Sequence, residues 1–482
     1  MNDLAIIRDG DDDDNNRTLK GDIITLRDHR PDFVKWEKSK CTIVFVGMYT
    51  IKQNNNEYIT IYSLPKYYPV PEDKYTSEHI SKVQHHIKKI CEVVEKLKKE
   101  KLKEEKRKKK NIFDDEEFLF DPYAYDQNVK TDPVNRFELA EYIIEDYLQN
   151  GLYVKDFTET RKGGFGRVGW GRTVAKIQPV IQDDGPVYLD LMNRHHMIDE
   201  NDLISVIHAN VLNQCLDFIG PLISDGIEYI DTEPLGEDLS HYSSTINARS
   251  TYVFKEREIN LFKALEAWCD CTRFYKNYAG VTCFDRVWEW VNDSVWGNTE
   301  HPESERPTYH IAQKNYSGGG EAIPDTIRIE DNEGEKEVFI FDSKYYTIKS
   351  IDSKNSQIYG FPANSDIVKQ VAYLKLIKSQ YSAKYFYNLF LLPESYDNCE
   401  GEEKGAFRIP SGKWFTTIGF VKPGAFNLDL NRRDEENDDE ERVGIIFINP
   451  EKLYERYLKG SEAEYSDLSE TKSYLLCSQC LT

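Results

Sequence analysis

The sequence predicts an α/β (α+β) protein with several domains. From about residue 280 onward, segments with helical and strand patterns follow one another as helix, strand, strand, helix and strand. This order is typical of a mixed central sheet with helices packed on it. The chain has 482 residues, of which 39% are hydrophobic and 13% aromatic. A chain of this size and composition is expected to form about two or three folded domains.

Three regions are expected along the chain. Residues 1–130 form a β-rich region with a basic helix, and residues 131–278 form a middle domain that is a candidate partner-contact region. Residues 279–482 contain the mixed sheet flanked by helices.

Charge and cysteine content restrict the class of protein. The formal net charge of −22 argues against a protein that coats nucleic acid through bulk charge. This net charge is compatible with a local cationic groove that binds DNA, or with a basic partner that brings the DNA. The nine cysteines are scattered, as expected for reduced thiols in a cytoplasm. Because no apolar run of about 18 residues occurs, we expect no transmembrane helix, and the cysteines lead us to expect a cytoplasmic protein.

The N-terminal region combines a hairpin with a long helix. Residues 1–35 are acidic and are expected to be poorly ordered. The runs "CTIVFVGMYTI" (41–51) and "EYITIYSLP" (57–65) flank the turn-like "KQNNN", which predicts a β-hairpin. Apolar residues recur at helical spacing over 80–110, and this helix runs into a lysine-rich segment (98–111). That segment either contacts DNA or a partner, or is a solvated helix end.

The middle region is predicted to contain helices and a glycine-rich turn. Helical patterns cover residues 136–151, 199–218 and 258–278. The stretch "RKGGFGRVGWGRTVAK" (161–176) lacks the GKS or GKT of a Walker phosphate-binding loop. We therefore expect a glycine-rich β-turn that leads into a strand.

The stretch "EVFIFDSKYY" (337–346) raises the main functional question. Four apolar residues, Val338–Phe341, predict a buried strand, yet Asp342 and Lys344 follow directly. These two side chains are two residues apart, so they project from the same face of the strand. Asp325 begins the preceding strand, and the turn "DNEGEK" joins the two. In an antiparallel hairpin, Asp325 therefore lies beside Asp342 and Lys344.

Two carboxylates and a lysine at one strand end are suited to metal-assisted hydrolysis of a phosphodiester. Mg²⁺ prefers oxygen ligands and keeps several waters, so Asp325 and Asp342 are predicted to bind it. The metal polarises the scissile phosphate and acidifies a bound water. Lys344 is predicted to orient or deprotonate that water, or to offset charge on the phosphorane. Asp-x-Lys alone is a weak signal, and its placement on two predicted strands between two helices makes it stronger.

Two flanking helices supply further candidates. In "CFDRVWEWVNDSVWGN" (283–298), Glu289 borders an apolar stripe and is predicted to complete the acidic metal site, directly or through water. An ordinary boundary glutamate is the alternative. In "PANSDIVKQVAYLKLIKSQ" (362–380), Gln370 is expected to bind a phosphate or to hold a catalytic side chain. The predicted catalytic residues are Glu289, Asp325, Asp342, Lys344 and Gln370.

At these residues the sequence resembles a known family. "IPD" followed by "VFIFDSKYY" resembles the signature of PD-(D/E)XK nucleases, in the form found in McrC-like subunits and LlaJI-type restriction endonucleases. "FDRVWEWVNDSVWGN" is similar to the family segment that places Glu289 at the acidic position, and "SDIVKQVAYLKLI" to the one that contains Gln370. "GRVGWGRTVAK" resembles another family element, represented here by Trp170, Arg172 and Thr173.

The resemblance covers about residues 140–460 and has two departures. Ser343 stands where the family often has alanine, which is a harmless change. Asp285 stands where glutamate is common, and it is not expected to be a ligand.

The resemblance implies partners as well as chemistry. It implies a Mg²⁺-dependent endonuclease of a restriction system, an anti-phage defence, that cleaves double-stranded DNA together with a McrB-like AAA+ GTPase motor. GTP would enter only through that motor, and a DNA methyltransferase of the same system would protect the host. The glycine-rich turn at 161–171 and the hairpin at 41–65 become candidates for motor contact. A plain structural turn is the alternative for each.

Two other functions are compatible with the sequence. A noncatalytic adaptor would activate a GTPase or ATPase motor and use the nuclease fold as a scaffold. A repair or recombination nuclease would share the fold and the chemistry. Convergence of Asp325, Asp342 and Lys344 would support the restriction nuclease, whereas a separation of more than about 10 Å would favour the adaptor.

Overall fold

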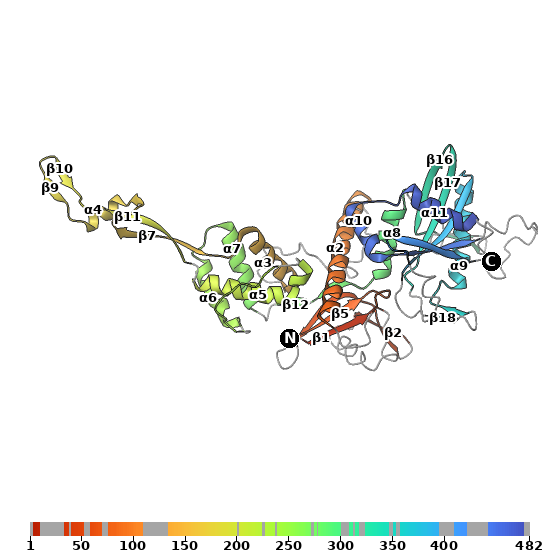
Figure 1. Cartoon of the computed structure of the whole chain (residues 1–482), viewed down its shortest axis with the longest axis horizontal. Helices are drawn as coiled ribbons and strands as arrows, with labels where there is room; N and C mark the ends of the chain where they lie inside the picture. Colours follow the sequence, from red (N-terminus) through yellow and green to blue (C-terminus); the bar gives the residue numbers. More distant parts are fainter. Residues whose placement is uncertain are drawn as a thin grey trace, which may run out of the picture. The chain divides into compact units, whose positions relative to one another are not determined.

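A computed structural model of the chain shows two compact units (Figure 1). One unit comprises Met1–Asp121 and Tyr278–Thr482, and the other comprises Pro122–Asn277. The N-terminal region, expected as a region of its own, thus belongs to the same compact unit as the C-terminal mixed sheet. The structure describes residues 3–476 except for 10–32, 38–39, 53–57, 70–75, 109–133, 200–201, 224–226, 237–238, 271–273, 277, 300–307, 312–313, 318–322, 347–349, 353–356, 395–408 and 422–441.

A five-stranded mixed sheet lies in the C-terminal part of the first unit and confirms the predicted fold class. In spatial order its strands are β16 (Thr326–Asn332), β17 (Glu335–Ser343), β20 (Tyr385–Pro393), β22 (Val443–Ile448) and β21 (Phe415–Val421). β17, β20 and β22 run parallel, and β16 and β21 are antiparallel to their neighbours. The parallel strands are nearly continuous apolar runs, as expected for strands that are buried on both faces.

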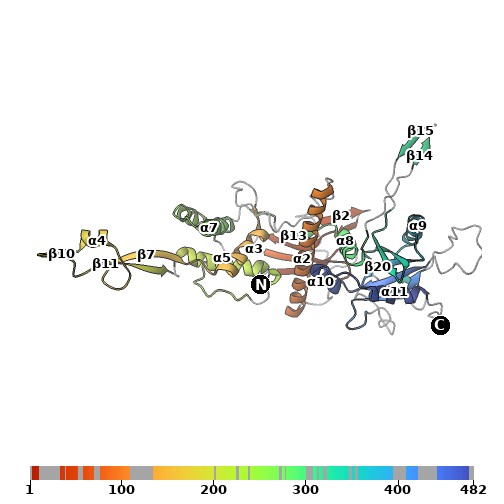
Figure 2. The same cartoon turned by 90° about the horizontal axis from the view of Figure 1, so that it is seen from above.

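Helices cover both faces of this sheet. α8 (Phe284–Trp296), α9 (Asn364–Gln380) and α11 (Tyr465–Leu476) pack directly on its strands. α2 (Ser77–Lys108) and α10 (Pro450–Lys459) pack against α8. α2, α8, α10 and α11 share one hydrophobic core with one face of the sheet, and α9 covers the other face. Figure 2 shows α9 and α11 on opposite sides of β20. The predicted helices at 80–110, 283–298 and 362–380 are thereby confirmed.

A four-stranded sheet at the N-terminus contains strands from distant parts of the sequence. In spatial order they are β1 (Asp3–Arg8), β5 (Tyr58–Leu64), β4 (Val46–Lys52) and β13 (Tyr278–Val281). β4 and β5 form the predicted hairpin. The expectation of poor order over residues 1–35 is wrong for β1, because β1 pairs in parallel with β5. β13 leads directly into α8, so this sheet is linked closely to the helix of the C-terminal part.

The close approach of β4 and β13 requires glycine at two facing positions. Gly47 and Gly280 are paired in register and have φ angles of 150° and 159°. A Cβ atom on Gly280 would lie 2.3 Å from the carbonyl oxygen of Val46 and 2.6 Å from the ring of Phe45. A Cβ atom on Gly47 would lie 2.1 Å from the carbonyl oxygen of Ala279. The strands therefore fit together only because neither position carries a side chain.

The described part of the second unit contains several helices and a short ladder. They are α3 (Arg136–Asn150), α4 (Trp170–Lys176), α5 (Leu203–Ile223), η2 (Ser240–Tyr242), α6 (Ser243–Ser250) and α7 (Glu256–Cys269), with β6 (Val134–Asn135) parallel to β12 (Phe274–Lys276). α3, α5 and α7 confirm the predicted helices. The predicted helix at 258–278 is wrong beyond Cys269, because its last part forms β12.

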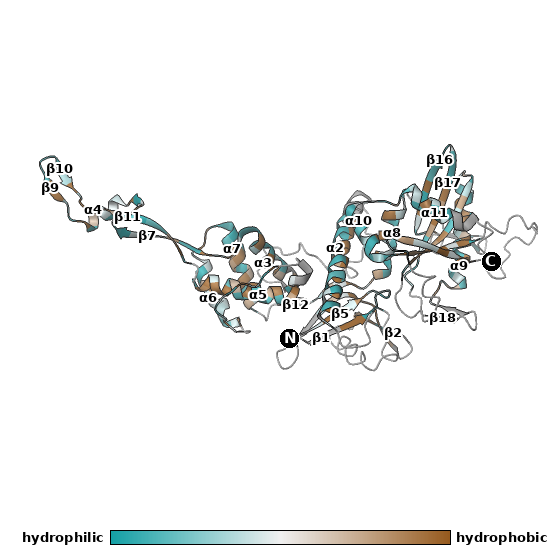
Figure 3. Cartoon of the chain, in the orientation of Figure 1, coloured by the Kyte–Doolittle hydropathy of each residue, from teal (hydrophilic) through white to brown (hydrophobic). Residues whose placement is uncertain are grey.

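Helix α5 is the most apolar helix of this unit by composition, and it is largely brown in Figure 3. An 18-residue window, Leu203–Gly220, is long and apolar enough to cross a membrane, but 61% of it is buried in the fold. α5 packs against α3 and α7. This packing is what a core helix of a folded domain requires, because its apolar side chains are covered by neighbouring helices.

A long two-stranded arm projects from the helices of the second unit (Figure 1). β7 (Lys155–Lys162) and β11 (Met192–Asp199) pair antiparallel along their full lengths. Between them lie β8 (Arg167–Val168), α4 and the hairpin of β9 (Val180–Gln182) and β10 (Gly185–Val187). We call residues 155–199 the arm. Its glycine-rich turn is present as predicted, but it leads through the two-residue β8 into helix α4 rather than into a longer strand.

Three short antiparallel hairpins complete the described elements. They are β2 (Val34–Glu37) with β3 (Lys40–Ile43), β14 (Thr308–Ile311) with β15 (Lys314–Ser317), and β18 (Ser350–Asp352) with β19 (Gln357–Tyr359). The "KQNNN" turn from residue 53 onward and the end of the lysine-rich segment beyond Lys108 lie outside the described residues.

Candidate active site

Two acidic residues meet at one end of the β16–β17 hairpin. Asp325 immediately precedes β16, and Asp342 follows the apolar run of β17. Because Thr326 pairs with Phe341, Asp325 and Asp342 lie side by side at this end of the hairpin. The Asp325 carboxylate accepts a hydrogen bond from the N–H of Ser343 at 2.8 Å. The predicted antiparallel arrangement of the two strands is confirmed, and it brings Asp325 to the residue next to Asp342.

Lys344 completes a compact charged group with these carboxylates. Its Nζ lies 2.7 Å from Asp342 Oδ2 and 3.8 Å from Asp366 Oδ1, and its side chain is 13% exposed. Burial disfavours the ammonium, but the carboxylates, above all that of Asp342, raise the pKa of Lys344 above its ordinary value. Lys344 is therefore charged at neutral pH. A charged ammonium is suited to binding an anionic oxygen and unsuited to acting as a base.

Glu289 joins this group from helix α8. The neighbouring Trp288 and Val291 are fully buried, which leaves Glu289 half-buried at the border of the apolar stripe. Burial and then the charge of Asp285 raise the pKa of Glu289 to about 7. Asp342 acts in the same direction, and Lys344 lowers the pKa. Glu289 therefore interacts electrostatically with Asp342 and Lys344. We call Asp325, Asp342, Lys344 and Glu289 the strand-end cluster.

The Asp325 carboxyl resists ionisation in this cluster. Burial and the charges of Asp342 and Glu289 raise the pKa of Asp325 to about 8, although the N–H of Ser343 and the ammonium of Lys344 favour the carboxylate. Like charges that are held together at a partly buried place are destabilising unless a cation neutralises them. Perturbed carboxyls of this kind are enriched at functional sites.

The donor set fits a hard divalent cation such as Mg²⁺. Asp342 Oδ1 is buried and accepts no hydrogen bond from any residue that the structure describes. Across the described residues, no three His, Cys, Asp or Glu side chains form a ready-made metal site. Mg²⁺ is commonly bound by one or two carboxylates and keeps several waters. Asp325 and Asp342 are the residues that would hold it, and the inclusion of Glu289 stays a prediction.

Gln370 lies in the interior, between α9 and the sheet. Its side chain is fully buried, and its amide nitrogen donates to the carbonyl oxygens of Ile340 at 3.3 Å and Leu389 at 3.4 Å. The amide of Asn388 donates to the backbone carbonyl of Gln370 at 3.1 Å. Gln370 was expected either to bind a phosphate or to hold a catalytic side chain. Its hydrogen bond to Ile340 fits the second role, because Ile340 lies on the strand that carries Asp342. A direct contact with a phosphate would require the side chain to leave its buried position.

Two further residues, not predicted from the sequence, interact with this charged group. Asp366, in the first turn of α9, accepts hydrogen bonds from the Tyr346 hydroxyl at 3.0 Å and from the N–H of Ala363 at 2.9 Å, and it faces Lys344. Lys369, one turn further, interacts electrostatically with Asp342 and Glu289. Both lie in the stretch "SDIVKQ", in which only Gln370 was predicted to belong to the site. The signal is that Asp366 and Lys369 are three residues apart, a spacing that places both on one face of α9.

The other predicted residues belong to the second compact unit. Trp170, Arg172 and Thr173 lie on α4 of the arm. Trp170 is 59% exposed and Arg172 is exposed, whereas Thr173 is fully buried. The Thr173 hydroxyl accepts a hydrogen bond from the N–H of Met192 at 3.0 Å and fixes α4 to β11. Thr173 is thus structural, while Trp170 and Arg172 are available for contact.

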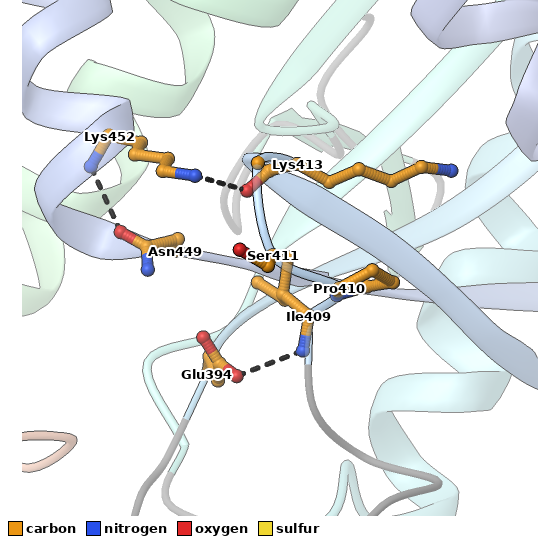
Figure 4. A pocket seen from close by; sticks show the side chains of 8 residues that line it. Glu394, Ile409, Pro410, Ser411, Lys413, Asn449 and Lys452 are labelled. Atoms are coloured by element: carbon orange, nitrogen blue, oxygen red, sulfur yellow. Dashed lines mark hydrogen bonds between the residues drawn. The ribbon is translucent and has the colours of Figure 1, made fainter.

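A cavity of about 330 Å³ lies at the carboxyl ends of β20 and β22 (Figure 4). Its lining includes Glu394, which accepts from the N–H of Ile409 at 3.0 Å, and Lys452, whose ammonium donates to the carbonyl of Lys413 at 2.7 Å. No predicted catalytic residue lines this cavity. The candidate active site is therefore the strand-end cluster and not this cavity.

Comparison with known proteins adds the family. The chain is 26% identical over 352 residues to "Type II restriction enzyme BsuMI component YdjA" of Bacillus subtilis (strain 168), with 70% of each chain covered. A chain in the refined half-complex of Thermococcus gammatolerans McrB AAA+ hexamers with bound McrC is 10% identical, with 95% of this chain and 99% of that chain covered and a TM-score of 0.31. Residues 45–403 match the family described as LlaJI restriction endonuclease. With most of its length in this match, the chain belongs to the LlaJI restriction endonuclease family.

Proposed function

We propose that this chain is the nuclease subunit of a restriction system and hydrolyses DNA phosphodiester bonds with Mg²⁺ at a PD-(D/E)XK site. The observation that carries the proposal is the meeting of Asp325, Asp342 and Lys344 at one strand end, with Glu289 in electrostatic range. Membership of a restriction endonuclease family supports it over a repair or recombination nuclease. A partner that delivers the subunit to DNA would account for the net charge of −22, since such a subunit needs little affinity of its own.

Each side chain of the cluster has a distinct role in this proposal. A bound Mg²⁺ would polarise the scissile phosphate and lower the pKa of a coordinated water. Asp325 and Asp342 would hold the cation. The Lys344 ammonium would bind a non-bridging phosphate oxygen and offset the charge that develops on it. The Glu289 carboxylate would complete the acidic site, directly or through a water on the cation.

The full chain tests this proposal on supercoiled plasmid DNA, alone and with its motor subunit and GTP. We expect cleavage with MgCl₂, no cleavage with EDTA, and no cleavage by Asp342→Ala whose melting curve shows a folded protein. Cleavage by a folded Asp342→Ala protein would contradict the assignment. If wild type is inert and Lys344→Ala still stimulates the GTPase of the motor, the chain is a noncatalytic adaptor.

We further propose that the arm is the contact for an AAA+ GTPase motor subunit, and that a DNA methyltransferase of the same system protects host DNA. Large apolar side chains are unusually exposed on the arm: Phe165 is 96%, Ile181 75% and Leu189 76% exposed. Exposed apolar groups that cluster on one element mark interaction sites in soluble proteins. By contrast, the described side chains of the 41–65 hairpin are mostly buried in their sheet, so that hairpin offers less contact surface.

Three substitutions on the arm test the motor contact. We expect Phe165→Ser, Trp170→Ser and Ile181→Ser together to abolish GTP-dependent cleavage and to weaken binding to the motor subunit at least tenfold, an effect typical of losing buried aromatic anchors. Cation-dependent nicking without the motor is expected to stay at the wild-type rate. Tyr252→Ser is the matched control, because Tyr252 is 82% exposed in the same unit but lies off the arm. Unchanged motor binding by the triple variant would refute the contact.

A further inference from the structure

The turn that follows β5 contacts the two chain segments that carry Lys344 and Glu289. This turn, residues 65–68, is closed by a hydrogen bond from the N–H of Tyr68 to the carbonyl of Pro65 at 3.0 Å. Lys66 contacts Tyr345, the residue after Lys344, and Tyr67 contacts Trp288, the residue before Glu289. The N-terminal sheet therefore reaches the immediate chain neighbours of two candidate catalytic residues.

Tyr345 is held by the N-terminal sheet through its hydroxyl and its ring. The backbone N–H of Lys66 donates to the Tyr345 hydroxyl at 2.8 Å, and that hydroxyl is hydrogen-bonded to the side chain of Asp9 at the end of β1. The Lys66 ammonium lies 4.9 Å from the centre of the Tyr345 ring and 3.9 Å from Asp9 Oδ2. Tyr345 itself is 7% exposed. A buried hydroxyl with a donor and an acceptor is fixed in position.

Tyr67 forms the second contact, with the helix that carries Glu289. Its ring centre lies 6.2 Å from that of Trp288 and 6.5 Å from that of Phe284, both on α8. The Tyr67 hydroxyl is hydrogen-bonded to the hydroxyl of Tyr454 on α10 at 2.5 Å and lies 3.3 Å from His86 Nε2 on α2. Tyr67 is thus fixed by two further helices and is a rigid surface for α8 to pack on.

Lys344 depends on such anchors because it lies beyond the regular strand. β17 ends at Ser343, and the N–H of Lys344 donates to the carbonyl of Leu391 at 2.9 Å as its last link to the sheet. After it, Tyr345 is bound to the N-terminal sheet, while Tyr346 is bound to Asp366 on α9. Tyr345 lies on the face of the central sheet that α8 covers, and Tyr346 lies on the face that α9 covers. The chain after Lys344 is therefore held from both faces.

We propose that the N-terminal sheet is a positioning element of the active site, which sets the location of Lys344 through Tyr345 and that of Glu289 through Tyr67. The proposal rests on the proposed nuclease function. It gives the N-terminal region a role in catalysis that is separate from any partner or DNA contact. Tyr345, Tyr67 and Asp9 are positioning residues, since none of them needs to touch DNA or the metal for this role.

The test uses Tyr345→Phe in the full chain, a change that removes one hydroxyl and keeps the ring. We expect single-turnover cleavage of saturating plasmid DNA to slow about tenfold, because small displacements of a catalytic group have effects of this size or larger. DNA affinity and Mg²⁺ affinity are expected to be unchanged. Hydrogen exchange at the Lys344 amide, measured without metal or DNA, is expected to become several times faster.

Tyr457→Phe is the matched control. Tyr457 on α10 is buried, and its hydroxyl donates to Glu100 on α2 at 2.6 Å. This variant therefore also removes a hydroxyl that joins two elements distant in sequence, but neither residue contacts Tyr345 or Trp288 through this bond. It is expected to cleave at the wild-type rate with normal exchange at Lys344. Asp9→Ala is a second variant from the other side of the contact, and combining it with Tyr345→Phe is expected to add no further slowing.

The outcomes separate this inference from the proposed function. Wild-type cleavage and wild-type exchange in Tyr345→Phe and Asp9→Ala would overturn the positioning role, even if Asp342→Ala abolishes cleavage. Equal slowing by Tyr345→Phe and Tyr457→Phe would also overturn it, because the effect would then be one of general stability. If Asp342→Ala retains cleavage, the nuclease site itself is wrong, and faster exchange at Lys344 would still report the contact.

Discussion

Replacing Lys344 with methionine is expected to reduce DNA cleavage by about 10³-fold or more while leaving the affinity for divalent cations intact. Methionine keeps the length and apolar stem of the side chain but removes the ammonium that lies 2.7 Å from Asp342. That ammonium is the group expected to offset charge on the phosphate. Calorimetric titration with MgCl₂ measures cation binding, and a plasmid cleavage time course measures the rate. Cleavage within tenfold of wild type would contradict the role of Lys344.

The controls for this prediction separate lost chemistry from lost stability. In the metal-free protein, Lys344→Met leaves the Asp342 carboxylate buried without its partner, which costs about 3–5 kcal/mol when a buried pair is broken in this way. The pair variant Asp342→Asn with Lys344→Met removes both charges and is expected to regain much of that stability without regaining cleavage. Lys384→Met removes an exposed lysine that pairs with Glu335, and it is expected to behave as wild type.

In the metal-free protein, the carboxyls of Asp325 and Glu289 are expected to contribute stability that is lost as the pH rises from about 4 to about 8, the interval between their ordinary and raised pKa values. In the folded state the pKa is raised to about 8 for Asp325 and to about 7 for Glu289. Within this interval these two carboxyls bind more protons in the folded protein than in the unfolded chain. Stability contributed by the protonated carboxyls is therefore present at low pH and is lost as pH rises. Thermal melts in EDTA across this range measure the effect.

Asp325→Asn is expected to flatten this dependence. At pH 8 the variant should melt roughly 5 °C above wild type in EDTA, because an amide carries no charge to bury, and at pH 4 the two should coincide. MgCl₂ is expected to raise the melting temperature of wild type, most strongly at high pH, and to have little effect on the variant. Glu335→Gln, at an exposed position, is the control. An equal change in melting temperature between pH 4 and pH 8 for wild type and Asp325→Asn in EDTA would contradict the raised pKa of Asp325.

Much of the C-terminal fold follows from local patterns. The run Val338–Phe341 predicts a buried strand because strands that are covered on both faces read as continuous apolar runs. The turn before it and Asp325 at the start of the neighbouring strand predict an antiparallel hairpin, which the register of Thr326 with Phe341 confirms. The stripe that leaves Glu289 half-buried is equally local. These features depend on residues a few positions apart, so periodicity suffices.

Other features depend on residues far apart in the sequence. The strand Asp3–Arg8 was missed because its partner, β5, lies some fifty residues away and supplies the hydrogen bonds that an acidic N-terminus alone would not predict. The helix at Trp170–Lys176 was missed because it is seven residues long and is fixed to β11 by the buried Thr173. Neither element has enough internal periodicity to stand out.

The sequence by itself determined the residue types of the site, their order and the strand end on which they lie, because side-chain alternation and hairpin geometry are local. Tertiary structure decided the rest. It placed Gln370 in the interior, brought Asp366 to Lys344, and joined the N-terminal sheet to Tyr345 across 279 residues of chain. The charge state of each carboxyl was also decided there, since a pKa depends on burial and on neighbouring charges that only the folded chain brings together.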